Sequence, residues 1–240
     1  IGKNTQIAIN LCEADFYVTC DGDDISSKDR FSKLINFFQD DETKVNLIAT
    51  DAYLMTKSGD IQSVKMSTDL QSIKTVSDLL ATKPIFFGAT TAFTKDLIID
   101  YPDINEGVYG VDQIMLLRSM MKGGAKTLHE PLVYHREGGV TGFQANNVYE
   151  KINRFKIDSV RSVEDFSQMI LDSRGTVYEE IVYQKIYRNL AVEKFKNDMF
   201  SMKHSVEKIK LFFACRNVPI FKRIRFFSYA MFGPFLNILW

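Results

Sequence analysis

The chain has 240 residues, of which 45% are apolar and 25% are charged, and this balance excludes the low-complexity and disordered classes. Its formal net charge is zero, but residues 1–150 carry 14 Lys and Arg against 21 Asp and Glu, whereas residues 151–240 carry 16 against 9. We therefore expect an acidic part suited to cations and a basic part suited to an anionic surface.

The first forty residues predict a helix, a strand and a second helix. Residues 4–14 have helical apolar spacing, the run at 16–20 predicts a buried strand, and Ser26 or Ser27 is placed to cap the next helix. The apolar faces expected for the two helices are Ile7, Leu11 and Ala14 in the first, and Phe31, Leu34, Ile35 and Phe38 in the second.

Strands and helices alternate between residues 45 and 136. The expected elements are, in chain order, one or two strands over 45–56, a turn at 57–60, a short capped helix over 75–82, a strand or strand pair over 84–94, a short helix from 95, a helix over 109–124 and a strand over 125–136. This alternation predicts an α/β layer structure with a mixed sheet flanked by helices.

The pattern changes near residue 145. Strand signals fade there, and two long helical patterns follow at 162–174 and 176–200. We therefore predict two parts, an α/β domain over residues 1–144 and a helical C-terminal region over residues 145–240.

Three acids, Asp21, Asp23 and Asp24, directly follow the first predicted strand. Carboxylates this close repel one another unless a cation or hydrogen-bond donors compensate, and ligands of open α/β sheets bind beyond the carboxyl ends of the strands. The cluster therefore predicts a site for Mg²⁺ or Mn²⁺, bound together with substrate phosphates. A solvated turn in which Asp24 or Ser26 caps the next helix is the competing interpretation.

Two further interpretations of the acid cluster can be weighed. A calcium EF-hand loop is excluded, because Ile25 and Ser26 stand where that loop needs an oxygen ligand and a glycine. A phosphohydrolase would use Asp21 as nucleophile and Asp23 as acid and base. That second scheme stays open at this point.

Two segments together resemble the family-two glycosyltransferases of GT-A fold, especially those that build bacterial surface polysaccharides. They are YVTCDGDDISSKDRFSKLINFF and VDQIMLLRSMMKGGAKTLHEPLVYHREGGVTG. In the second, Asp112 opens a helix, Arg118 lies six residues beyond it, and the following strand ends in His135 and Arg136. The order and spacing of the two segments carry the resemblance, which covers roughly residues 2–142.

The resemblance implies an inverting, metal-dependent enzyme that transfers a sugar from a nucleotide-sugar donor. The resemblance implies that Asp112 is the catalytic base. It also implies that the acid cluster binds the diphosphate of the donor through Mn²⁺ or Mg²⁺. The implied donor-binding residues are Asp21, Asp23, Asp24 and Arg136, the implied metal ligands are Asp21, Asp23 and His135, and Arg118 and Gly88 take acceptor-binding or structural roles. The processive Q-x-x-R-W signature is absent, which favours transfer of one sugar at a time.

Two features depart from the family pattern. Val111 stands where the family has a Glu beside the base, and the family's opening strands, which hold the nucleotide base, have no counterpart in the sequence. We therefore expect the chain to be a fragment of such an enzyme, with a non-catalytic glycosyltransferase-like scaffold as an alternative. Gly138 and Gly139 predict either a flap over the donor or a simple turn.

The C-terminal tail is basic and apolar at once. Residues 203–240 carry seven Lys and Arg against one acid, interleaved with Phe, Ile and Leu. The favoured interpretation is a helix in the membrane interface, anchored by Lys222, Arg223 and Arg225, which suits a glycan or lipid-linked acceptor. A terminal helix packed on the catalytic domain is the alternative. No nucleic-acid-binding module accompanies the charges, so we expect no nucleic acid partner.

Cysteine usage and hydropathy bear on the compartment. The three cysteines, Cys12, Cys20 and Cys215, are odd in number and are not spaced as zinc ligands, which favours a reducing environment. No apolar run reaches the length of a membrane span. We therefore expect a cytoplasmic protein at the inner face of the plasma membrane.

Overall fold

The computed structural model describes residues 1–39, 45–137 and 147–236. Within these residues the strands are β1 (Phe16–Val18), β2 (Ile25–Ser26), β3 (Leu47–Met55), β4 (Ile61–Lys65), β5 (Thr91–Thr94) and β6 (Ala125–Arg136). The α-helices are α1 (Gly2–Leu11), α2 (Arg30–Gln39), α3 (Val76–Thr82), α4 (Asp96–Ile99), α5 (Val111–Lys122), α6 (Val148–Ser173), α7 (Glu179–Ser201), α8 (Ser205–Ala214) and α9 (Ile220–Leu236). The short 3-10 turns are η1 (Leu70–Ser72) and η2 (Gly88–Thr90).

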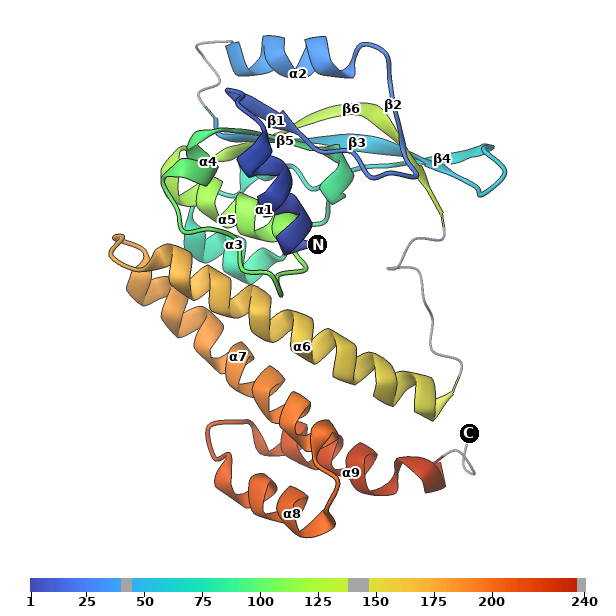
Figure 1. Cartoon of the computed structure of the whole chain (residues 1–240), viewed down its shortest axis with the longest axis vertical. Helices are drawn as coiled ribbons and strands as arrows, with labels where there is room; N and C mark the ends of the chain where they lie inside the picture. The colour runs from blue at the N-terminus through green and yellow to red at the C-terminus, as the bar shows by residue number, and fades with distance from the viewer. Residues whose placement is uncertain (40–44, 138–146, 237–240) are drawn as a thin grey trace.

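The molecule is a mixed α/β protein followed by a helical C-terminal region (Figure 1). A curled sheet lies between α2 on one face and α1, α3, α4 and α5 on the other (Figure 1). The long helices α6 and α7 pack beneath this second layer, and α8 and α9 lie at the end farthest from the sheet (Figure 1). The predicted α/β class with a helical C-terminal region is therefore confirmed at this level.

The direction of the strands brings the ends of β1, β3 and β6 to one edge. The strand order is β1-β5-β3-β6-β2, and β4 pairs with β3. Strands β3 and β6 are parallel, and β5 is antiparallel to both β1 and β3, so β1, β3 and β6 share one direction. The segment after β1 and the end of β6 therefore meet at the carboxyl edge of the sheet, where ligands of α/β proteins bind.

Local sequence signals account for most elements between residues 45 and 136. Helix α3 begins with the expected cap, because Thr75 Oγ1 accepts a hydrogen bond from Asp78 N and the Asp78 carboxylate accepts one from Thr75 N. Helix α5 ends at Gly123 as predicted. The segment 84–94 contains a 3-10 turn before its strand, so only its last four residues, Thr91–Thr94, form a strand.

Two predictions for the first forty residues are wrong. Neither Ser26 nor Ser27 caps α2, because Ile25 and Ser26 pair with β6 as a short strand and the helix begins only at Arg30. The predicted face of the first helix is also wrong, since Leu11 is 81% exposed and the buried residues are Gly2 and Ile9. That helix is held instead through its start, where Gly2 N donates to the carbonyl of Val108.

A buried ion pair joins α5 to α6. Arg118 Nε and Asp172 Oδ2 are 2.7 Å apart, and both side chains are almost completely buried. The other guanidinium donors bind the carbonyls of Leu97 and Pro102, and Gln168 donates to Asp172 Oδ1. Each nitrogen of the guanidinium thus donates a hydrogen bond, and both carboxylate oxygens of Asp172 accept one, which offsets the cost of burying the two charges.

The main hydrophobic core continues from the sheet into the C-terminal helices. Leu47 of β3 and Ile114 of α5 belong to the same buried cluster as Val182 and Ile186 of α7. A second cluster, centred on Phe195 of α7, fills the space between α6, α7, α8 and α9. In the described part of the chain, no helix combines the length and the apolar character needed to cross a bilayer.

The Arg118–Asp172 pair yields a stability prediction. Asp172→Ala leaves a buried, uncompensated guanidinium, so we expect it to lower the free energy of unfolding by about 3–5 kcal/mol. The double variant Arg118→Met/Asp172→Leu removes both charges and should recover most of that loss. Urea denaturation measures both. Asp158→Ala, which breaks a half-exposed pair on the same helix, is the control and should cost less than about 1 kcal/mol. An equal loss in the control would contradict the prediction.

Candidate active site

At the carboxyl edge of the sheet, Asp24 ties the loop after β1 to the end of β6. Its buried carboxylate lies 2.9 Å from His135 Nδ1 through Oδ2 and accepts the Arg136 backbone N–H at 3.0 Å through Oδ1. The Arg136 guanidinium donates to the backbone carbonyls of Asp23 and Lys57. Asp24 and Arg136 therefore hold the loop, and the donor-binding roles predicted for them stay predictions.

Asp21 and Asp23 differ from Asp24 in having uncompensated carboxylates. In the described residues neither side chain has a hydrogen-bond or ion-pair partner. Partial burial raises the pKa of Asp21 above its ordinary value, the charges of Asp24 and Asp23 raise it further, and His135 offsets part of the shift. The loop thus concentrates negative charge that a cation would relieve.

A turn at residues 87–89 joins this loop to the second half of the candidate site. The Phe87 ring stacks on His135 with 4.3 Å between ring centroids. The Gly88 carbonyl accepts a hydrogen bond of 2.5 Å from Thr19 Oγ1, two residues before Asp21. A Cβ atom built on Gly88 would lie 3.5 Å from the Cβ of Asp112. The turn therefore contacts the ends of β1 and β6, and Gly88 lies beside Asp112 at the start of α5.

Asp112 lies in the first turn of α5, as the sequence predicts. Burial raises the pKa of Asp112 above its ordinary value, and the nearby charge of Asp165 adds to the shift. A hydrogen bond from the backbone of Gln113 works in the opposite direction, because it favours the ionised form. A carboxylate with a raised pKa is a better proton acceptor than an exposed one, provided it remains ionised at the working pH.

Helix α6 supplies a residue that the sequence does not reveal. Asp165 Oδ1 accepts the backbone N–H groups of Tyr109 at 2.7 Å and Gly110 at 3.0 Å, directly before α5. A Cβ atom at Gly110 would lie only 3.0 Å from Asp165 Oδ2, so this close approach favours glycine. Asp165 therefore fixes the start of the helix that carries Asp112.

A buried arginine lies beneath the acid cluster and was also not predicted. Arg30 is 2% exposed, and its guanidinium donates to Ser26 Oγ at 3.0 Å and to the Ala89 carbonyl at 2.7 Å. Burial lowers the pKa of Arg30, whereas the charge of Asp24 raises it. The contact with Ala89 gives the 87–89 turn a third anchor. Nothing in the local sequence distinguishes Arg30 from an ordinary residue at the start of a helix.

Not every predicted site residue is gathered here. Arg118 is buried in the ion pair with Asp172, more than one helical turn along α5 from Asp112, so its role is structural. Gly88 lies in the connecting turn, facing Asp112. Gly138 and Gly139, the predicted flap or turn, lie outside the described residues.

The site offers an incomplete set of metal ligands. Across residues 1–39, 45–137 and 147–236, no group of three or more His, Cys, Asp or Glu side chains is arranged to hold a metal ion. Asp21 and Asp23 supply free carboxylates, and His135 has Nε2 left because Asp24 engages Nδ1. Such a set fits Mg²⁺ or Mn²⁺ when phosphate oxygens of a ligand complete the coordination.

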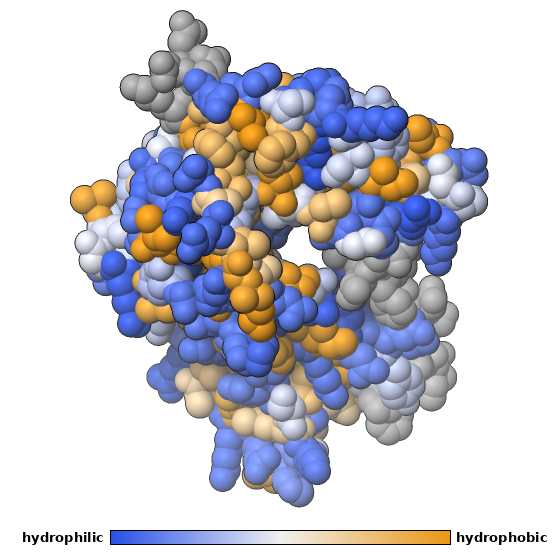
Figure 2. Space-filling view, turned by 45° about the horizontal axis from the view of Figure 1, so that its top comes forward, coloured by the Kyte–Doolittle hydropathy of each residue, from blue (hydrophilic) through white to orange (hydrophobic). Residues whose placement is uncertain are grey.

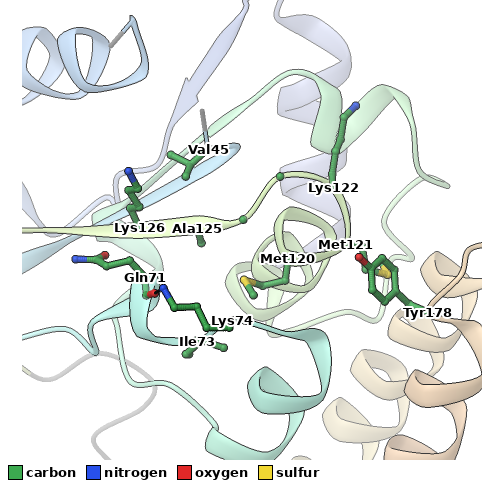
Figure 3. Close-up of a pocket in the computed structure, with 12 residues that line it drawn as sticks. Val45, Gln71, Ile73, Lys74, Met120, Met121, Lys122, Ala125, Lys126 and Tyr178 are labelled. Carbon is green, nitrogen blue, oxygen red and sulfur yellow. Dashed lines mark hydrogen bonds between the residues drawn. The ribbon is translucent and has the colours of Figure 1, made fainter. Parts of the chain in front are cut away.

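The surface has a hollow and a separate pocket. Figure 2 shows a face hollowed near its centre, with hydrophobic and hydrophilic residues on the rim. A cavity of about 410 Å³ opens at the far end of α5, between Lys74, Lys126 and Tyr178 (Figure 3). Because α5 rises about 1.5 Å per residue, this cavity is about 15 Å from Asp112. It is therefore not part of the candidate site.

Comparison with known proteins assigns no family to the chain. No protein-family model matches it, and no curated protein matches it.

The raised pKa of Asp21 predicts a pH-dependent gain in stability for Asp21→Asn. A raised pKa in the folded state means that ionisation opposes folding, so the penalty is absent below the unfolded pKa of about 4 and is present at neutral pH. Because Asp21 is exposed to solvent, we expect the melting temperature at pH 7 to rise by at most about 2 °C. Thermal melts of the parent chain and the variant at about pH 3 and about pH 7 measure the difference in melting temperature. Asp69→Asn, at an exposed acid outside the cluster, should show no such change, and a gain that is larger at acidic pH would refute the prediction.

Proposed function

We propose that this protein is a GT-A-like glycosyltransferase that moves one sugar from a nucleotide-sugar donor to a hydroxyl of a glycan or lipid-linked acceptor, with inversion. The observation that carries the proposal is the 87–89 turn, which accepts a hydrogen bond from Thr19 in the loop after β1 and places Gly88 beside Asp112 at the start of α5. The turn links two motifs that are about ninety residues apart in the sequence, and this link supports a single site. The finer fold class and the activity follow from this proximity together with the sequence resemblance.

In the proposed reaction, Asp112 takes the proton of the acceptor hydroxyl as its oxygen attacks the anomeric carbon. The bond between that carbon and the diphosphate oxygen breaks, and the nucleoside diphosphate leaves with the electron pair. Attack from the face opposite the leaving group inverts the anomeric centre. The raised pKa of Asp112 suits this proton transfer.

Asp21 and Asp23 hold the donor end of the reaction. Their free carboxylates would bind Mn²⁺ or Mg²⁺, and the ion would neutralise charge on the departing diphosphate. Asp24 and Arg136 keep the loop in register with the end of β6. The His135 ring stacks on Phe87, so it lies between the end of β6 and the 87–89 turn.

The two alternatives from the sequence predict different behaviour. A phosphohydrolase with Asp21 as nucleophile assigns no role to Asp112, which lies beside the turn that is hydrogen-bonded to the acid loop. A non-catalytic scaffold needs no functional acids at the edge of the sheet, yet Asp21 and Asp23 remain uncompensated there. Transfer is therefore the better-supported function.

Calorimetry with Mn²⁺ and a panel of UDP, GDP, dTDP and pyrophosphate tests the proposal. We expect diphosphate binding that requires the metal and is lost in Asp21→Asn/Asp23→Asn. The matched control is Asp69→Asn, at an exposed acid outside the cluster. Absence of metal-dependent binding would support the scaffold, and beryllium fluoride trapped on Asp21 would support the phosphohydrolase.

Asp112→Asn separates chemistry from binding. The amide cannot accept the hydroxyl proton, so we expect turnover to fall by about 10²–10⁴ while metal-dependent diphosphate binding persists. Turnover assays with the donor that binds, alongside calorimetry, measure the two effects. Turnover that survives in Asp112→Asn would remove Asp112 from the role of base.

Asp165→Asn tests the control of the base through its pH profile. The amide oxygen can still accept the N–H groups of Tyr109 and Gly110, but the negative charge near Asp112 is lost. The pKa of Asp112 should therefore fall, and the acid limb of kcat/KM should move to lower pH. Asp158→Asn on the same helix is the control with an unchanged profile. A profile that does not move in Asp165→Asn would show that Asp165 acts only in positioning.

A further inference from the structure

Helices α8 and α9 form a hairpin at the end of the molecule farthest from the sheet (Figure 1). One face of this hairpin is packed. Phe226 of α9 is buried and makes edge contacts with Phe155 of α6 and Phe200 of α7, at centroid distances of 5.7 and 6.3 Å. Arg223 donates to the carbonyls of Val218 and Phe212, which fixes the turn between the two helices. The hairpin is thus a built part of the fold.

Each helix also carries a second apolar face that the protein does not cover. In α8, Val206 and Phe213 are 63% and 67% exposed, and Ile209 lies between them at helical spacing. In α9, Ile220, Phe221, Ile224 and Phe232 are each at least half exposed. A helix turns 100° per residue, so this face of α9 lies opposite the one that carries Phe226.

The charges around these apolar faces are of one sign. Residues 203–236 contain seven Lys and Arg and a single acid, Glu207. Lys203, Lys210 and Arg216 are exposed, and within the described residues no ion pair involves α8 or α9. Burial lowers the pKa of Lys208, and the positive charge of Lys156 lowers it further.

We propose that the α8–α9 hairpin docks on a lipid bilayer containing anionic lipids, with its uncovered apolar side chains in the headgroup region and its Lys and Arg side chains against the lipid phosphates. Exposed Phe and Ile flanked by unpaired cations are the features of a helix that lies in the interface plane. Juxtamembrane cations add attraction to an anionic leaflet. The proposal does not depend on the transferase function.

Charge argues against the other occupants of this surface. A second copy of the chain would bring two surfaces of the same positive sign together, and like charges across an interface oppose association. A nucleic acid would satisfy the cations but would leave Phe213 and Phe221 in water. An anionic bilayer is the partner that accommodates both the charge and the apolar side chains.

Flotation of the full chain with vesicles tests the proposal. We expect binding to phosphatidylcholine vesicles that contain about 30% phosphatidylserine, little binding to pure phosphatidylcholine, and release at about 0.5 M salt. Phe213→Ser/Phe221→Ser should lower the partition coefficient about tenfold or more. Val177→Ser, at a residue that is 92% exposed in the turn between α6 and α7, is the apolar control and should bind like the parent chain.

A second pair of variants tests the charges. Lys210→Glu/Arg216→Glu should lower binding to the anionic vesicles about tenfold, whereas Lys65→Glu on the exposed strand β4 should leave it unchanged. Thermal melts confirm that each variant is folded. No binding of the parent chain to anionic vesicles, or equal binding by the Phe213→Ser/Phe221→Ser variant, would overturn the proposal. A dimer in sedimentation that this variant dissociates, without vesicle binding, would assign the face to a second copy.

Discussion

The buried pair of Arg118 and Asp172 connects the two parts of the chain that the composition separates. Residues 1–150 are acidic and residues 151–240 are basic, yet one charge of each sign meets between α5 and α6, and each guanidinium nitrogen donates a hydrogen bond. Removing one partner would leave an unpaired charge in the core, which is far costlier than losing a surface pair. The ion pair therefore fixes the position of α6 along the axis of α5.

That fixed placement is what allows α6 to shape the candidate site. Two turns before Asp172, the carboxylate of Asp165 reaches the backbone directly before α5 and sets the position and charge environment of Asp112. The turn containing Gly88 then connects Asp112 to the loop after β1. Stability and proposed chemistry consequently share one set of contacts, from the core ion pair to the edge of the sheet.

The same C-terminal helices face two environments. Val182 and Ile186 of α7 complete the main core, whereas α8 and α9 expose Phe and Ile beside unpaired cations. If the α8–α9 hairpin contacts a membrane, the carboxyl edge of the sheet lies outside that contact, because the hairpin is at the end of the molecule farthest from the sheet (Figure 1). One face of α9 packs on α6 and α7 of the helical region, and the opposite face is uncovered. The membrane contact of the tail stays a proposal.

The elements that depend on local signals can be predicted from the amino-acid sequence: the alternation between residues 45 and 136, the Thr75 cap, the end of α5 at Gly123 and the acids after β1. These follow from periodicity and capping, which neighbours along the chain decide. Contacts between distant parts of the chain explain why Ile25 and Ser26 pair with β6 instead of capping a helix, why Leu11 is exposed, and why Arg30 and Asp165 support the candidate site. Their roles depend on partners tens of residues away, and nothing local in the sequence specifies which distant backbone group a side chain will reach.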